Sequence, residues 1–73
     1  MVTAIAPRTV RPATMGDVHD GQQFRTDTGW ATAVGDAKPT EGRTGFVTIT
    51  RRTLAGVTMT NDYRAARPTT IKL

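Results

Sequence analysis

Asp17, His19 and Asp20 are the side chains best suited to hold a metal ion in this 73-residue chain, because oxygen and imidazole ligands crowd one short segment. Positions 17 and 19 share a face if the segment is a strand, but His19 and Asp20 are adjacent and would point apart. The chain has one histidine and no cysteine, which excludes thiolate sites and disfavours structural zinc. We expect a solvated turn here, with no metal and no cofactor.

The triplet Asp27-Thr28-Gly29 could supply a catalytic carboxylate. It resembles the turn at which aspartic proteases bring together two carboxylates that share a proton, an arrangement that a dimer of half-sized chains could build. An apolar strand precedes the triplet in that family, whereas Arg25 and Thr26 precede it here. The triplet therefore favours an ordinary hairpin turn.

Nucleophilic catalysis lacks its usual side chains in this sequence. Serine and cysteine are absent, and the single histidine has no nucleophile to activate. We therefore expect no catalytic residue, no small-molecule substrate and no enzymatic activity.

The charge pattern indicates an acidic partner surface or a phosphate-bearing one. The net charge is +4 with a pI near 10.8, and most of the basic residues are arginine. Such a bias attracts anions, although it is weaker than the dense Lys/Arg stripe of dedicated nucleic-acid binders.

Three arginines and one aromatic residue of the middle segment are the candidate contact residues. They are Phe46, Arg43, Arg51 and Arg52. Arginine can clamp phosphates or carboxylates, and an outward aromatic ring can stack on a base. Alternation along a strand places Phe46 outward, whereas we expect Phe24 and Trp30 to be core residues because so small a domain needs them.

The chain is short enough that burial alone makes a marginal core. It holds 18 large apolar residues and no cysteine, so a disulfide cannot staple it. Oligomerisation or docking onto a larger protein is the stabilising device that remains.

Short apolar and threonine-rich runs separated by turn signals predict an all-β fold. Asp20-Gly21 predicts a tight hairpin between residues 18–19 and 22–26, and residues 35–45 predict a long solvated loop. The other expected strands cover residues 30–34, 46–50, 57–63 and 69–73. In the hairpin of residues 46–63, valine, isoleucine and methionine should face inward and threonine outward.

Residues 1–13 predict an extended N-terminal arm, with an edge strand around Thr9 to Arg11, that precedes a barrel of residues 14–73, because Pro7 and Pro12 favour extended backbone. The arm cannot fold alone, so we expect it to gain order on a partner. Its candidate contact residues are Val2, Ile5, Arg8, Val10 and Arg11. No segment suggests a membrane helix or a signal peptide, and a soluble location in the cytoplasm or a virion is expected.

The layout of five short strands, a central loop and a brief turn before the last strand resembles SH3-like small barrels. The resemblance implies a five-stranded antiparallel barrel over residues 15–73. An OB-type barrel is the nearest alternative, but the helix it would place between its third and fourth strands has no counterpart in the sequence.

These observations favour a non-catalytic structural or assembly protein that docks on a larger protein lattice through its arm and a sheet edge. A phage capsid decoration or connector protein would suit such a chain, and a homo-oligomer is a further form of assembly. The alternatives are a nucleic-acid-binding small barrel and a small protein-binding inhibitor that uses the loop of residues 35–45.

Overall fold

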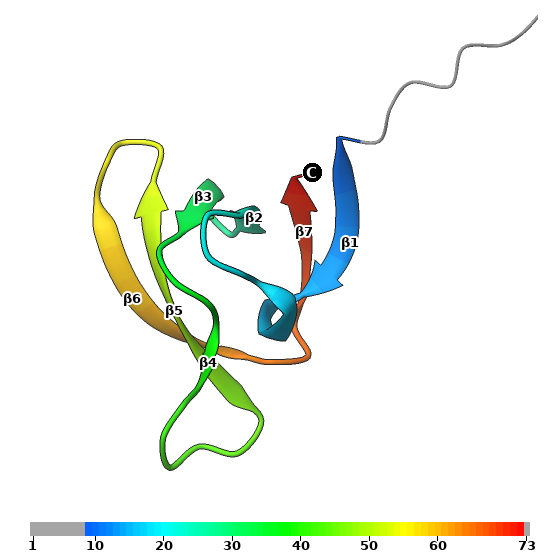
Figure 1. The fold of residues 1–73 in the computed structure, drawn as a ribbon, viewed down its shortest axis with the longest axis vertical. Coiled ribbons are helices and arrows are strands. Elements are labelled where there is room, and N and C mark those ends of the chain that lie inside the picture. The colour runs from blue at the N-terminus through cyan, green and yellow to red at the C-terminus, as the bar shows by residue number, and fades with distance from the viewer. Residues whose placement is uncertain (1–8, 73) are drawn as a thin grey trace, which may run out of the picture.

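The computed structural model describes residues 9–72, and within them almost all regular structure is β (Figure 1). The expected all-β class is therefore confirmed. The elements are β1 (Val10–Thr14), a 3-10 turn η1 (Met15–Asp17), β2 (Gln23–Thr26), β3 (Gly29–Ala33), β4 (Lys38–Pro39), β5 (Phe46–Thr53), β6 (Thr58–Arg64) and β7 (Pro68–Lys72).

The seven strands of residues 9–72 form one antiparallel sheet that curls into a half-barrel (Figure 1). The strand order is β1-β7-β2-β3-β5, and the long strand β5 pairs with β3 and β4 along one edge and with β6 along the other. η1 lies at an end of the curl, where the backbone N–H groups of Met15 and Gly16 donate to the carbonyls of Arg67 and Ala65.

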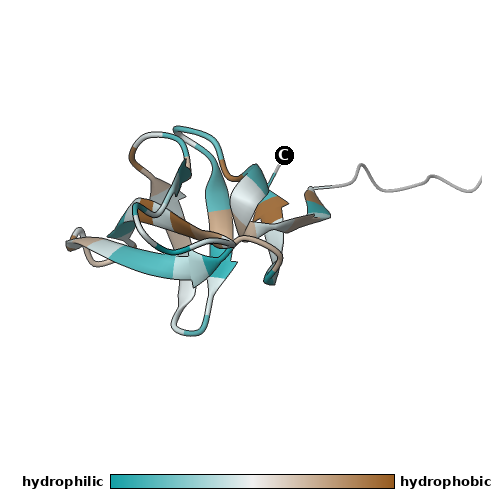
Figure 2. Ribbon diagram, turned by 90° about the horizontal axis from the view of Figure 1, so that it is seen from below, coloured by the Kyte–Doolittle hydropathy of each residue, from teal (hydrophilic) through white to brown (hydrophobic). Residues whose placement is uncertain are grey.

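The core fills the concave side of the curl. Hydrophobic stretches come from several different strands around it (Figure 2). Phe24 and Ile71 are register partners in neighbouring strands, and Met15 from η1 caps them. The buried hydrophobic side chains are Met15, Val18, Phe24, Ala31, Ala33, Val47, Ile49 and Ile71. The inward direction predicted for Val47 and Ile49 is confirmed, whereas Val57 and Met59, which the same pattern predicts to face inward, are exposed because they lie near the tip of their hairpin.

Two strands lie in segments that the sequence predicts as arm and loop. β1 pairs with β7 from Val10↔Lys72 to Thr14↔Pro68, so the edge strand predicted around Thr9 to Arg11 is present and continues to Thr14. β4 lies inside the predicted loop and pairs with the start of β5. The predicted arm residues Val2, Ile5 and Arg8 lie outside the described residues.

The hairpin predicted around Asp20-Gly21 is wrong in its first strand. Residues 18 and 19 form no strand, and Val18 instead enters the core. The Asp20 carboxylate accepts a hydrogen bond from the backbone N–H of Gly35 at 2.8 Å, and this contact ties the turn to the segment after β3. The hydrogen bond from Gly35 to the Asp20 side chain thus takes the place of the strand pairing that the sequence predicts for residues 18 and 19.

β3 presents the opposite face from the one predicted for its aromatic residue. Ala31 and Ala33 are buried in the core, whereas Trp30 is half-buried on the convex face. β3 lies between β2 and β5 in a tightly curled sheet, where the concave side has room for methyl groups and little more. Phe24, in contrast, is fully buried as predicted.

Candidate functional site

The predicted contact residues of the middle segment lie at three separate places. Phe46 is half-buried on the convex face, with the Arg43 guanidinium 3.8 Å and the Arg64 guanidinium 5.3 Å from its ring centroid. Arg43 also pairs with the Asp62 carboxylate at 3.4 Å. At this end of the sheet both guanidinium groups lie over the Phe46 ring, and one of them, Arg43, is also paired with a carboxylate of the chain.

Arg51 and Arg52 point to opposite faces because adjacent side chains alternate along β5. Arg52 is exposed on the convex face, where its register partners are Thr32 and Thr58. Arg51 is only 8% exposed and lies on the concave face beside Ala33 and Met59. The two arginines therefore cannot clamp one phosphate together.

The β5–β6 hairpin extends beyond the core and leaves β6 at an edge of the sheet (Figure 1). In the described part of the chain β6 pairs with β5 alone, from Arg52↔Thr58 to Phe46↔Arg64. Edge strands expose unpaired backbone N–H and C=O groups, which can accept another strand. Residues 58–61 carry no charge and no proline that would block such pairing.

Exposed apolar side chains gather at the tip of this hairpin. Leu54 is 79% exposed, Val57 54% and Met59 42%. In the tight turn before Val57, the Gly56 N–H donates to the Thr53 carbonyl, and the Thr53 N–H donates to the Val57 carbonyl. Because Arg51 is the register partner of Met59, Met59 faces the concave side. An apolar patch of Leu54, Val57 and Met59 thus adjoins an open strand edge.

Arg51 adds a positive charge beside this patch. Its Nε donates to Asn61 Oδ1 at 3.3 Å, and its Nη2 lies 3.8 Å from the Met59 sulfur. Its Nη1 is buried and has no hydrogen-bond partner, and within residues 9–72 no carboxylate pairs with it. A buried charge without a counter-charge is costly, so this position favours an incoming acidic group.

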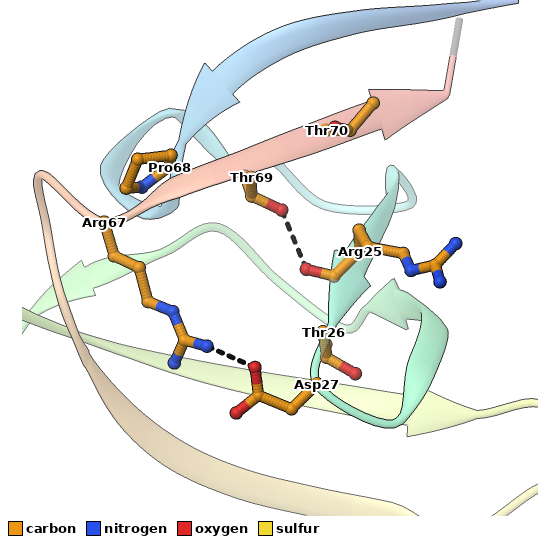
Figure 3. Close-up of a pocket in the computed structure, with 7 residues that line it drawn as sticks. All are labelled: Arg25, Thr26, Asp27, Arg67, Pro68, Thr69 and Thr70. Carbon is orange, nitrogen blue, oxygen red and sulfur yellow. Dashed lines mark hydrogen bonds and ion pairs between the residues drawn. The ribbon is translucent and has the colours of Figure 1, made fainter.

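An ion pair closes the opposite side of the concave face. The Arg67 guanidinium donates to the Asp27 carboxylate at 2.5 Å (Figure 3). The same guanidinium lies 5.9 Å from the Tyr63 ring centroid. Two small hollows of about 250 and 240 Å³ share Thr26, Asp27 and Arg67, one on the β7 side and one on the Arg51 side. The pair therefore holds the β2–β3 turn against the β6–β7 turn.

The triplet Asp27-Thr28-Gly29 forms the turn between β2 and β3, as the hairpin interpretation predicts. Thr26 Oγ1 donates to the Gly29 carbonyl at 2.8 Å, and Gly29 has a φ of 121° that other residues rarely adopt. The glycine and the carboxylate thus serve the turn and its ion pair.

The predicted cluster at residues 17–20 is divided among three different contacts. The backbone N–H and hydroxyl of Thr14 both donate to Asp17 Oδ2, and these hydrogen bonds lower the pKa of the Asp17 carboxyl. His19 Nδ1 lies 3.7 Å from Asp36. No group of three or more histidine or acidic side chains in residues 9–72 could hold a metal ion.

Sequence reasoning missed the hairpin tip and the burial of Arg51. The alternation of residues 46–63 was enough to assign the two faces, and the register bears it out. The alternation could not reveal that the hairpin tip extends past the neighbouring strand, because this depends on the register with β3. The pairing of β3 with β5 covers residues 51–53 and stops before the tip at residue 54.

Comparison of the chain with protein-family models, with curated proteins and with solved structures finds no match. Across residues 9–72, no helix has the length and apolar character needed to cross a membrane.

Proposed function

We propose that this protein is a non-catalytic docking module that binds an extended segment of a partner protein along β6. The observation that supports the proposal most strongly is the open edge of β6, uncharged over residues 58–61, beside the apolar patch of Leu54, Val57 and Met59. A strand added to this edge gains backbone hydrogen bonds, and its alternate side chains can cover the patch.

The edge strands β1 and β6 differ in the residues that could block pairing with another chain. β1 pairs with β7 along one side, and its sequence VRPAT carries an arginine and a proline. Proline and charge are common devices that keep edge strands from pairing with other chains. The stretch of residues 57–61, VTMTN, has neither. The contrast supports β6 as the edge that receives a partner.

Charge supports an acidic partner over a second copy of this chain. The net charge is +4, so two copies repel each other. A copy paired through β6 would bring Asp62 on its convex face, where Thr48 Oγ1 and Arg43 already bind it. It would bring no carboxylate to Arg51. A partner strand with a glutamate or aspartate next to its apolar residues would supply a counter-charge for Arg51 and cover the apolar patch.

A larger protein assembly, such as a phage capsid, is the kind of partner that we propose for the whole chain. In that setting the segment before β1 would act as an N-terminal arm, and the curled sheet would serve as an SH3-like barrel. The small core of the protein supports this proposal, because docking buries surface that the chain cannot bury by itself.

Selection of random displayed peptides on the immobilised protein tests the proposal. We expect enrichment of peptides in which valine or leucine alternates with acidic residues. Val57→Lys should lower their affinity at least about tenfold, because it places a charge in the apolar patch and on the open edge. Val34→Lys is the matched control, since Val34 is also an exposed valine, at 43%, and lies outside the hairpin.

The proposal fails if no peptide is enriched, or if Val34→Lys weakens binding as much as Val57→Lys. Light scattering on the purified protein tests the remaining alternative, in which a second copy of the chain pairs with β6. A stable dimer that Val57→Lys dissociates would show that a second copy, and not an acidic partner, covers β6.

A further inference from the structure

The convex face of β2, β3 and β7 carries a second cluster that the docking proposal does not use. Phe24 and Ile71 are buried register partners, so their neighbours Arg25 and Lys72 point to the convex face. The half-buried ring of Trp30 lies there as well, opposite Arg25 in the register. The Lys72 ammonium is 4.6 Å and the Arg25 guanidinium 5.8 Å from the ring centroid.

This face bears positive charge, and the strands that form it contribute no acidic residue. Strands β1, β2, β3, β5 and β7 contain no aspartate or glutamate. Arg52 extends the same face, because its register partner Thr32 is two residues from Trp30 on β3. The salt bridges found in residues 9–72 engage His19, Arg43 and Arg67, and none engages a cation of this face.

We propose that this convex face binds single-stranded nucleic acid, with Trp30 stacking on a base and Arg25, Lys72 and Arg52 contacting phosphates. An aromatic ring flanked by cations on a sheet is the arrangement by which single-strand binders take up bases without sequence preference. Carboxylate side chains of an acidic protein segment would satisfy the cations without stacking on the Trp30 ring, whereas every nucleotide supplies both a phosphate and a flat base. The docking proposal uses the β6 edge and the concave-side residues Met59 and Arg51, whereas this site lies on the convex face, chiefly on β2, β3 and β7.

The cluster around Phe46 provides a matched comparison. It also holds two cations next to an aromatic ring, Arg43 and Arg64, but Arg43 is paired with Asp62. Replacing two cations at either cluster removes the same charge from the protein. Only replacement of the two cations beside Trp30 should remove the nucleic-acid-binding site.

Titration of the full chain with oligothymidylate, followed by tryptophan fluorescence, tests the inference. Trp30 is the single tryptophan of the chain, so its emission reports on this face alone. We expect quenching at low salt, with affinity falling roughly 15- to 20-fold between 50 and 200 mM salt if about three phosphates are neutralised. The double variant Arg25→Gln/Lys72→Gln should bind at least about tenfold more weakly, and Arg43→Gln/Arg64→Gln no more than about threefold.

Three results would overturn the inference. The first is no quenching at 50 mM salt. The second is an equal loss of affinity in both double variants, which would show diffuse attraction by net charge. The third is equal quenching by polyglutamate, which would assign the face to acidic protein. Circular dichroism confirms folding of each variant, and Arg52→Gln, a single exposed change, repeats the test if a double variant unfolds.

Discussion

Arg51 is buried, and no carboxylate of residues 9–72 forms a salt bridge with it. A substitution that removes its charge should therefore stabilise the fold and weaken the binding of an acidic partner. The Arg51 guanidinium meets an amide oxygen and a thioether, with Nη1 left unpaired. Replacement by methionine keeps much of the length and removes the buried charge. We predict that Arg51→Met raises the free energy of unfolding by about 1 kcal/mol or more in urea titrations. The same change should weaken binding of acidic peptides.

Arg52→Met is the control for that prediction. Arg52 is exposed on the other face of β5, so its replacement should alter the free energy of unfolding by no more than about 0.5 kcal/mol. A loss of about 1 kcal/mol in Arg51→Met would mean that Arg51 is neutralised within the fold and would remove the case for an incoming carboxylate.

Asp17 gives a pH dependence with a definite sign. Hydrogen bonds from the backbone N–H and hydroxyl of Thr14 hold its pKa below the ordinary value of 3.8. A carboxyl with a lowered pKa in the folded state stabilises the protein above its ordinary pKa, and this contribution is lost as pH falls through the lowered value. We predict that wild type and Asp17→Asn differ in free energy of unfolding at pH 6 and converge below pH 3. Parallel curves over that range would contradict the assignment.

At the scale of elements, the two faces of β3 follow from how tightly the sheet curls. Alternation correctly separates Trp30 and Thr32 from Ala31 and Ala33, but the sequence favours the tryptophan as the buried member. Residue size misleads here because the concave side is narrow where β3 crosses it. For β5 and β6, the sequence likewise predicts which residues share a face. It does not predict how far the hairpin extends past the core, because this depends on where the pairing of β5 with β3 stops.

Overpacking the narrow side of β3 should therefore be costly. We predict that Ala31→Leu lowers the free energy of unfolding by about 1–3 kcal/mol, because the added carbons have no space beside Phe24. Thr32→Leu, on the convex face of the same strand, should change it by no more than about 0.5 kcal/mol. Urea denaturation of both variants checks the difference, and equal losses would show that β3 is packed on both sides.

In the molecule as a whole, the sequence indicates the all-β class and an edge strand around Thr9 to Arg11, but it does not show that this strand runs on to Thr14 or which strand it pairs with. Pro12 favours extended backbone, which an arm and an edge strand share, so local conformation cannot tell the two apart. Only the long-range pairing of Val10–Thr14 with β7 does so, and its partners lie more than fifty positions away along the chain.

Truncation separates the two parts of the predicted arm. Deleting residues 1–12 removes the pairings of Val10, Arg11 and Pro12 with β7 and uncovers Ile71. We predict a loss of at least about 1 kcal/mol, or roughly 4–8 °C in Tm. Deleting residues 1–8 retains every strand pairing of residues 9–72 and should leave a fold that melts at a higher temperature than the longer deletion. Identical melting of the two truncated proteins would show that β1 adds nothing to the sheet.

NMR mapping of a selected acidic peptide on the isotope-labelled protein tests whether an acidic extended segment pairs with β6. We predict that the largest amide shifts fall on residues 54–61, with a shift of the Arg51 side-chain signals. Those amides should also become protected from hydrogen exchange. Shifts centred on the Trp30 face, or none along β6 at saturation, would contradict this pairing.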